Sequence, residues 1–207
     1  MPTLLAYGGP VMWLILIAAA TAAVVFVERA LYCHRSQINS AEFLNGIRTV
    51  IKRGNVVEAI SICDATPGPV ARLVKSAILH REQGRDRVRE AVEEAGLTEV
   101  PRLEEKLNLL ATIAQISPLL GLFGTIVGFI SMFSRLQTAG LYANLTGGPD
   151  SLAAGVWTSL ICAAGGIAVA IPSHAAYNYL VSRVNKIVLD MERAAAEIVN
   201  IVTENGK

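Results

Sequence analysis

The chain has 207 residues, of which 53% are hydrophobic and 17% are charged, with a formal net charge of +1. Soluble domains usually carry about 25% charged residues, so this composition disfavours an ordinary soluble domain and favours a membrane protein. The near-zero net charge also excludes the strongly basic chains that bind nucleic acid.

The apolar residues are concentrated in three blocks that contain no Asp, Glu, Lys or Arg: 1–27, 107–134 and 151–182. A helix that spans a membrane needs about 20 apolar residues, and each block is long enough. A buried helix of a soluble protein would explain any one of them, but three in so short a chain disfavour that alternative. We therefore expect three transmembrane helices.

The distribution of positive charge predicts the orientation. Most Lys and Arg residues lie between Arg29 and Lys106, and four more follow Ser182, while none lies in the first ten residues. The first block therefore lacks the positive start of a signal peptide and indicates an uncleaved anchor. Positive residues favour the cytoplasmic side, which predicts an N-out, C-in chain. The expected segments are a short periplasmic N-terminus (1–10), transmembrane helix 1 (11–27), a cytoplasmic helical domain (28–106), transmembrane helix 2 (107–134), a periplasmic loop (135–150), transmembrane helix 3 (151–182) and a cytoplasmic C-terminal helix (183–207).

The cytoplasmic domain is predicted to be helical, with breaks at Gly54-Asn55, at 66–69 and at Gly84. Its last helix is expected to begin with Thr98 as the N-cap and Pro101 in the first turn. No strong breaker except Pro118 and the glycines follows between Leu103 and Arg135, so one continuous helix should lead into and through the second span.

The third span should likewise continue past residue 182 into an amphipathic tail. The predicted fold class is therefore an all-α membrane protein, in which three transmembrane helices extend into a cytoplasmic helical domain.

Small and weakly polar residues form one stripe on each of the last two spans. On the second span the stripe includes Ser117, Gly121, Thr125 and Gly128, and on the third it includes Thr158, Cys162 and Gly165 or Gly166. Close helix packing explains such stripes, because small residues let membrane helices approach one another. A narrow hydrated passage with Thr125 and Thr158 on its wall explains them too, and both explanations stay open. The residues assigned to packing or to kinks are Pro118, Gly124, Gly165, Gly166 and Pro172.

None of the three blocks contains a carboxylate, Lys or Arg. Ionisable groups inside membranes are costly and functional, so a proton-conducting chain of this kind would need an acid from another molecule. His174 is the only ionisable side chain in the third block, and it is assigned to the inner interface, with a proton relay as the alternative.

No enzyme motif appears, and the three cysteines have no metal-like spacing. We expect no enzymatic activity, no metal and no cofactor.

The second span, from Ser117 to Gly128, reads SPLLGLFGTIVG and resembles the signature of the MotA/TolQ/ExbB proton-channel family. The segment 168–172, followed by Ala176-Tyr177-Asn178, resembles the close of that family's third span. The three-span layout is similar to the ExbB/TolQ branch.

This resemblance implies a bacterial inner-membrane ring of five copies around a pair of ExbD/TolR-like single-span helices. Those helices would carry the titratable aspartate, and the complex would use proton motive force to act on a TonB- or TolA-like protein. A non-conducting scaffold of the same complex and a flagellar-type stator subunit are the alternatives.

The resemblance also implies roles for individual residues. Thr125 matches the pore threonine of the second span. In the third span, Thr158 stands where ExbB and TolQ typically carry a glutamate, and Ala163 stands where they carry another threonine. The missing glutamate is the reason for keeping the scaffold alternative.

Overall fold

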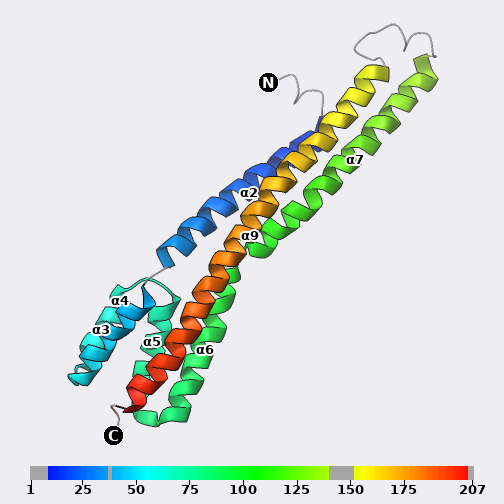
Figure 1. Ribbon diagram of the computed structural model, residues 1–207. Coiled ribbons are helices and arrows are strands. Elements are labelled where there is room, and N and C mark those ends of the chain that lie inside the picture. Colours follow the sequence, from blue (N-terminus) through cyan, green and yellow to red (C-terminus); the bar gives the residue numbers. More distant parts are fainter. Residues whose placement is uncertain (1–8, 37–38, 140–151, 205–207) are drawn as a thin grey trace. The chain divides into compact units, whose positions relative to one another are not determined.

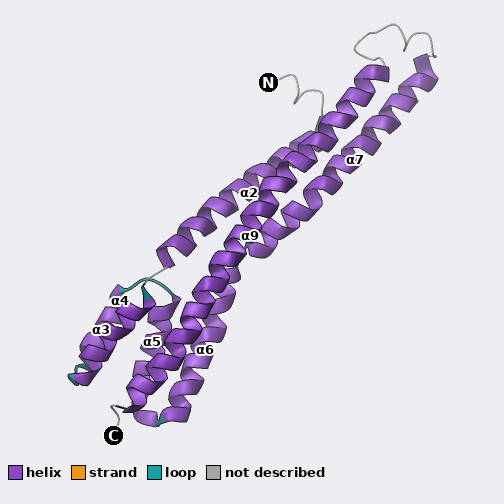
Figure 2. Cartoon of the chain, in the orientation of Figure 1, coloured by secondary structure: helices purple, strands orange, loops and turns teal. Residues whose placement is uncertain are grey.

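The computed structural model describes residues 9–36, 39–139 and 152–204, and these form helices joined by short turns (Figures 1 and 2). No strand occurs within these ranges. Three stretches are long and apolar enough to cross a membrane, and they lie within Pro10–Ser36, Arg85–Ser134 and Gly155–Thr203. The predicted all-α class with three long apolar helices is confirmed.

The first long helix, α2, covers Gly9–Ser36, and four shorter α-helices follow it. These are α3 (Ser40–Lys52), α4 (Val56–Ala65), α5 (Pro69–Leu79) and α6 (Arg85–Glu104), with a short 3-10 helix, η1 (Arg81–Gln83), before α6. The three predicted breaks fall between these helices. At the middle one Gly68 has φ 126°, and a Cβ there would lie 3.1 Å from the carbonyl oxygen of Ser36, so the turn needs glycine.

The expectation of one continuous helix from Leu103 to Arg135 is wrong. Helix α6 ends at Glu104 and α7 (Leu107–Ala139) begins after a break. At that break Glu105 is extended and Lys106 has φ 64°, a left-handed conformation that is unusual for lysine. The turn contains neither glycine nor proline, so no helix-breaking residue in the sequence indicated it.

The predicted cap at Thr98 is also wrong. Thr98 and Pro101 both lie inside α6, and the Thr98 hydroxyl donates to the carbonyl of Glu94 at 3.1 Å. Inside a helix a threonine hydroxyl can donate to the carbonyl one turn earlier. The Thr98 hydroxyl therefore has a partner without Thr98 being the N-cap of a new helix.

The last helix, α9 (Leu152–Glu204), has 53 residues and continues past residue 182 as predicted. At 1.5 Å per residue it is about 80 Å long. Helix α7 runs through Ala139, five residues into the range expected for the periplasmic loop. Most of that loop and most of the N-terminal segment 1–10 lie outside the described residues.

The chain divides into two compact units. Unit 1 comprises Met1–Val27 and Lys106–Asn178, and unit 2 comprises Glu28–Glu105 and Tyr179–Lys207. Unit 1 contains most of the apolar parts of α2, α7 and α9. In unit 2, α3 packs on α4, α4 on α5 and α5 on α6, so the short helices contact one another in chain order. Its buried side chains include Ile47, Val74, Ile78, Val88, Val184, Ile187 and Ile198.

Candidate channel wall

In unit 1, α7 and α9 touch through glycines. A Cβ added to Gly121 would lie 3.0 Å from the carbonyl oxygen of Cys162, and one added to Gly166 would lie 2.5 Å from the carbonyl oxygen of Ser117. The same Gly166 Cβ would be 2.8 Å from the Cα of Gly121. Real Cβ atoms do not approach backbone this closely, so the backbones are near each other only because both positions are glycine.

The contact continues along both helices with small side chains. A Cβ on Gly128 would clash with the hydroxyl of Ser159, a buried serine that the sequence analysis did not single out. The Ser159 hydroxyl donates to the carbonyl of Gly155 at 2.9 Å, and the buried Ser117 hydroxyl donates to Ile113 at 2.6 Å. These hydroxyls satisfy their hydrogen bonds within their own helices, so the contact between α7 and α9 is made by close packing.

Helix α2 packs against one side of this pair. A Cβ on Gly124 would lie 2.7 Å from the Cys162 Cβ and 3.1 Å from a Val11 methyl, and one on Gly165 would lie 3.3 Å from the Met12 sulfur. The side of the α7–α9 pair that carries Gly124 and Gly165 is therefore the side covered by α2.

The two predicted wall threonines lie on opposite edges of the α7–α9 contact. With about 100° per residue, Thr125 lies beyond Gly121 on the edge of α7 that points away from Gly124 and so away from α2. Thr158 is seven residues before Gly165, which places it on the α2 side of α9. Ala163 lies on the same edge as Thr125. Both threonines are half-buried, and the Thr125 hydroxyl donates to the carbonyl of Leu122 at 2.6 Å.

The structure therefore separates the predicted site residues into two groups. Seven of them form contacts between helices of this chain, which is the packing interpretation of the stripes: Ser117, Gly121, Gly124, Gly128, Cys162, Gly165 and Gly166. Thr125 and Thr158 remain at edges, where a wall residue could meet another molecule.

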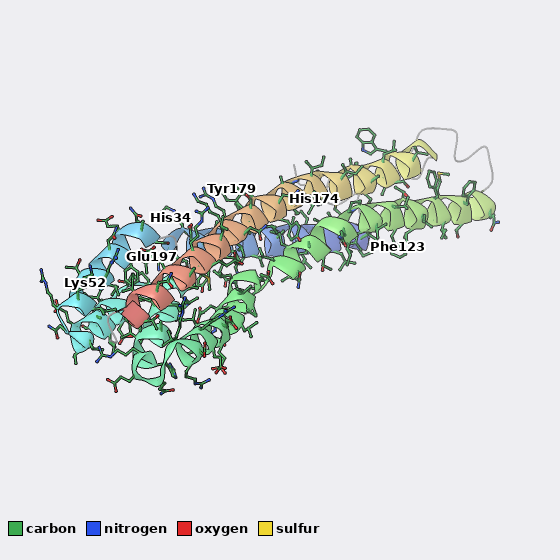
Figure 3. All side chains as sticks on the ribbon, turned by 60° about the horizontal axis from the view of Figure 1, so that its bottom comes forward. His34, Lys52, Phe123, His174, Tyr179 and Glu197 are labelled. Atoms are coloured by element: carbon green, nitrogen blue, oxygen red, sulfur yellow. The ribbon has the colours of Figure 1, made fainter. Side chains whose placement is uncertain are left out.

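Beside Thr125, the free surface of α7 is apolar. Phe123 is 54% exposed and is labelled on α7 in Figure 3. A shallow groove of about 460 Å³ lies along the same helix, lined by Ile126, Phe129, Ile130, Phe133, Ser134 and Gln137. This surface suits lipid tails or another apolar helix.

The remaining predicted positions are at the ends of these stripes. Pro118 is half-buried inside α7, and Pro172 is exposed inside α9. His174 is exposed, and its ring lies 6.4 Å from that of Tyr177, centroid to centroid (Figure 3). Within the described residues, no group of His, Cys, Asp and Glu side chains could hold a metal ion.

Unit 2 contains a charged cluster that the sequence analysis missed. The Arg29 side chain is 5% exposed, forms a salt bridge of 2.9 Å with Glu105 and donates to the carbonyl of Arg102 at 3.1 Å. Its guanidinium lies 5.5 Å from the centre of the Tyr32 ring. Arg29 therefore holds Glu105, the first residue of the α6–α7 break, against α2.

Glu99 continues this cluster. Its side chain is 5% exposed and accepts hydrogen bonds from Arg72 at 2.5 Å and from Arg102 at 3.0 Å. Burial lowers the pKa of Arg72, but the hydrogen bond and charge of Glu99, together with Tyr32, outweigh it and raise the pKa overall. A buried carboxylate held by two guanidiniums is costly to disturb. Sequence spacing alone could not show that Arg72 and Glu99, on different helices, would meet.

The cysteines of unit 2 are unreactive in this environment. Burial, with a further contribution from Asp64, raises the pKa of the Cys63 thiol to about 11, and burial also raises the pKa of Cys33. Since the thiolate is the reactive form, both thiols stay protonated near neutral pH.

The sequence is similar to proteins of one known family. The model of the MotA/TolQ/ExbB proton channel family matches residues 65–193. An ExbB homolog of Methanothermobacter thermautotrophicus is 26% identical over 179 residues, which cover 86% of this chain and 62% of the relative. The Tol-Pal system protein TolQ of Haemophilus influenzae is 38% identical over 104 residues, which cover 50% of this chain and 43% of the relative. The biopolymer transport protein ExbB of Aquifex aeolicus is 33% identical over 95 residues, 46% of this chain and 61% of the relative. The chain thus spans less than two thirds of the length of each of these three relatives.

Proposed function

Since the chain belongs to the MotA/TolQ/ExbB proton channel family and is a multi-pass membrane protein of the ExbB/TolQ type, we propose that it is the channel subunit of an ExbB–ExbD- or TolQ–TolR-type motor. The family is associated with transport and is not an enzyme family. In this proposal several copies surround a single-span partner in the bacterial inner membrane. The complex uses proton motive force for outer-membrane transport or envelope work through a TonB- or TolA-like protein.

The proposal rests mainly on how α7 and α9 pack together and on which side chains they leave at the edge. Its interior is filled by helix packing, and the edge opposite α2 offers one hydroxyl, Thr125, among apolar side chains. Neither apolar block, 107–134 or 151–182, contains a carboxylate, Lys or Arg. The chain can therefore supply a wall for an ion path but not the group that titrates.

We assign the titrating acid to an ExbD/TolR-like partner helix. Protonation neutralises a membrane carboxylate and removes most of the cost of moving it past apolar side chains. Each charge that crosses 100 mV releases about 2.3 kcal/mol, which is the energy available for work. Thr125, at the edge of the wall, would hydrogen-bond water or the charged acid.

The proposed wall is the face of the α7–α9 pair opposite α2, with Thr125 and Ala163 on it. Helix α2 covers the other side at Gly124 and Gly165, and Thr158 lies on that same side of α9, seven residues before Gly165. A pore role for Thr158 would therefore require a contact outside the proposed wall. Matched variants of Thr125 and Thr158 test the two positions separately.

The test is proton flux into vesicles that contain the chain and its partner, for which a neighbouring gene encoding one N-terminal span with a membrane aspartate is the candidate. Thr125→Val should lower flux about tenfold, because a hydrogen bond to a charged group contributes about 1.5 kcal/mol or more. Thr158→Val, the same change on the opposite edge, should lower it less. Vesicles with the chain alone should show no flux. Equal flux from the wild type and Thr125→Val would remove Thr125 from the wall.

A non-conducting scaffold is the second candidate, because the family resemblance implies a glutamate at the position of Thr158. Flux would then be absent even with the partner present, while the complex would still assemble. Co-purification of the two proteins, measured on the same vesicles, distinguishes a scaffold from a failure to assemble.

A further inference from the structure

Unit 2 has an open apolar groove between α6 and α9, which we call the α6–α9 groove. Its volume is about 510 Å³, and its apolar lining includes Leu73, Val92, Leu97, Val100, Val188 and Met191. Leu97 is 77% exposed, a high value for leucine on a packed helix. An open apolar groove of this kind, outside the charge-free blocks, is a candidate docking surface.

The rim of this groove is acidic. Glu93 and Glu192 line it, and Glu94 is exposed beside Glu93 on α6. Glu93 is paired with Arg89, whereas Glu94 and Glu192 form no salt bridge with a described residue. The groove therefore favours an occupant that carries apolar side chains next to positive charge.

The same chain offers such a surface at the other end of unit 2. Arg48, Lys52 and Arg53 at the end of α3 are all exposed, and none forms a salt bridge within the described residues. Val57, at the start of the next helix, is 79% exposed. These four residues define the α3 basic surface, on which Lys52 is labelled in Figure 3.

The arrangement of the short helices places these two surfaces apart. Because α3 packs on α4, α4 on α5 and α5 on α6, the α3 basic surface and the α6–α9 groove lie at opposite ends of a row. Two different, complementary surfaces on one chain form a head-to-tail contact, and such contacts close into rings when the rotation permits.

We propose that the α6–α9 groove receives the α3 basic surface of a second copy of this chain. Val57 of one copy packs near Leu97 of the next, and Lys52 and Arg53 face the acidic rim. The proposal rests on the part of the proposed function that assembles several copies, and it does not depend on ion conduction.

Cysteine cross-linking in membranes tests the contact. In a background with Cys33, Cys63 and Cys162 replaced by alanine, Val57→Cys and Leu97→Cys in one chain should produce dimers and larger oligomers with a bismaleimide reagent. Each single-cysteine variant should produce none, since its partner position lacks a thiol. Labelling with a fluorescent maleimide confirms that both cysteines are accessible.

Three results would overturn the proposal. Dimers from Leu97→Cys alone would show that groove faces groove, a cross-link to a different protein would identify another occupant, and accessible cysteines that give no cross-link would exclude the contact. Proton flux on the same vesicles shows separately whether the proposed channel function holds.

Charge exchange provides an independent check on the rim. Glu192→Lys should reduce the cross-linked yield about two- to fivefold, the range expected for one exposed ion pair. Lys52→Glu in the same chain should restore it, because the two charges exchange signs. If Lys52→Glu instead reduces the yield further, the rim does not face the α3 basic surface.

Discussion

At the scale of single residues, the adjacent glycines Gly165 and Gly166 of α9 have different neighbours. Gly166 lies against the Ser117 carbonyl and the Gly121 Cα, both of which are backbone atoms. Gly165, the preceding residue, faces the flexible end of Met12. Neighbouring glycines on one helix therefore differ in what a methyl group would displace.

Gly166→Ala should destabilise the protein by about 1–3 kcal/mol, because the added Cβ forces α7 and α9 apart. Gly165→Ala is the matched control and should cost less than about 1 kcal/mol, since a methionine side chain can rotate away and alanine favours a helix. Thermal unfolding in detergent, followed by the loss of helical circular dichroism, measures both. Equal midpoints for the two variants would contradict the close backbone contact.

The stripe of small residues was visible in the sequence, but its role was not. Helical periodicity shows that Ser117, Gly121, Thr125 and Gly128 lie near one face, without showing which neighbour that face meets. The structure places three of them in contact with α9 and leaves Thr125 at the edge. Thr125 and Thr158 are separated by the way α7 packs on α9, and α2 determines which side of that pair is covered. No pattern within a single helix encodes either contact.

At the scale of elements, the helix ends that could be predicted are those where glycine or proline interrupts the helix. The ends near Gly54, Gly68 and Gly84 were predicted, and all three glycines have positive φ. The break at Glu105 and Lys106 was missed because it lies in a helix-favouring sequence. At this break Arg29 forms a salt bridge with Glu105, a contact between residues far apart in the chain that no local pattern could predict.

Glu99→Gln tests the cluster that supports this region. An amide places an N–H group opposite two guanidiniums that can only donate, so the substitution should cost about 2–3 kcal/mol. Glu90→Gln on the same helix removes the exposed pair with Arg87 and should cost less than about 0.5 kcal/mol. Unfolding midpoints in detergent give both values, and a similar small loss for the two variants would show that Glu99 is not a structural residue.

At the scale of the whole molecule, the length of α9 requires that one helix serve two environments. Its charge-free part, up to residue 182, is about 45 Å long and exceeds the ~30 Å hydrocarbon core, whereas the part after Ser182 carries Arg183, Lys186 and Arg193. Helix α2 shows the same transition, from the apolar residues of unit 1 to the buried Arg29 of unit 2. We therefore place the proposed membrane boundary at this change of charge within continuous helices.

The proposed orientation follows from that change and makes a definite prediction. A cysteine introduced at the exposed Asn185 of α9 should react with a membrane-impermeant maleimide only after cells are permeabilised, because the basic part of α9 lies inside. A cysteine at Thr146, in the segment between α7 and α9, should react in intact cells. The native cysteines are buried, so the unsubstituted chain provides the background. The reverse labelling pattern would show that the topology is inverted. The charged cluster around Glu99 and the α6–α9 groove would then lie on the periplasmic side, and unit 2 could not assemble in the cytoplasm.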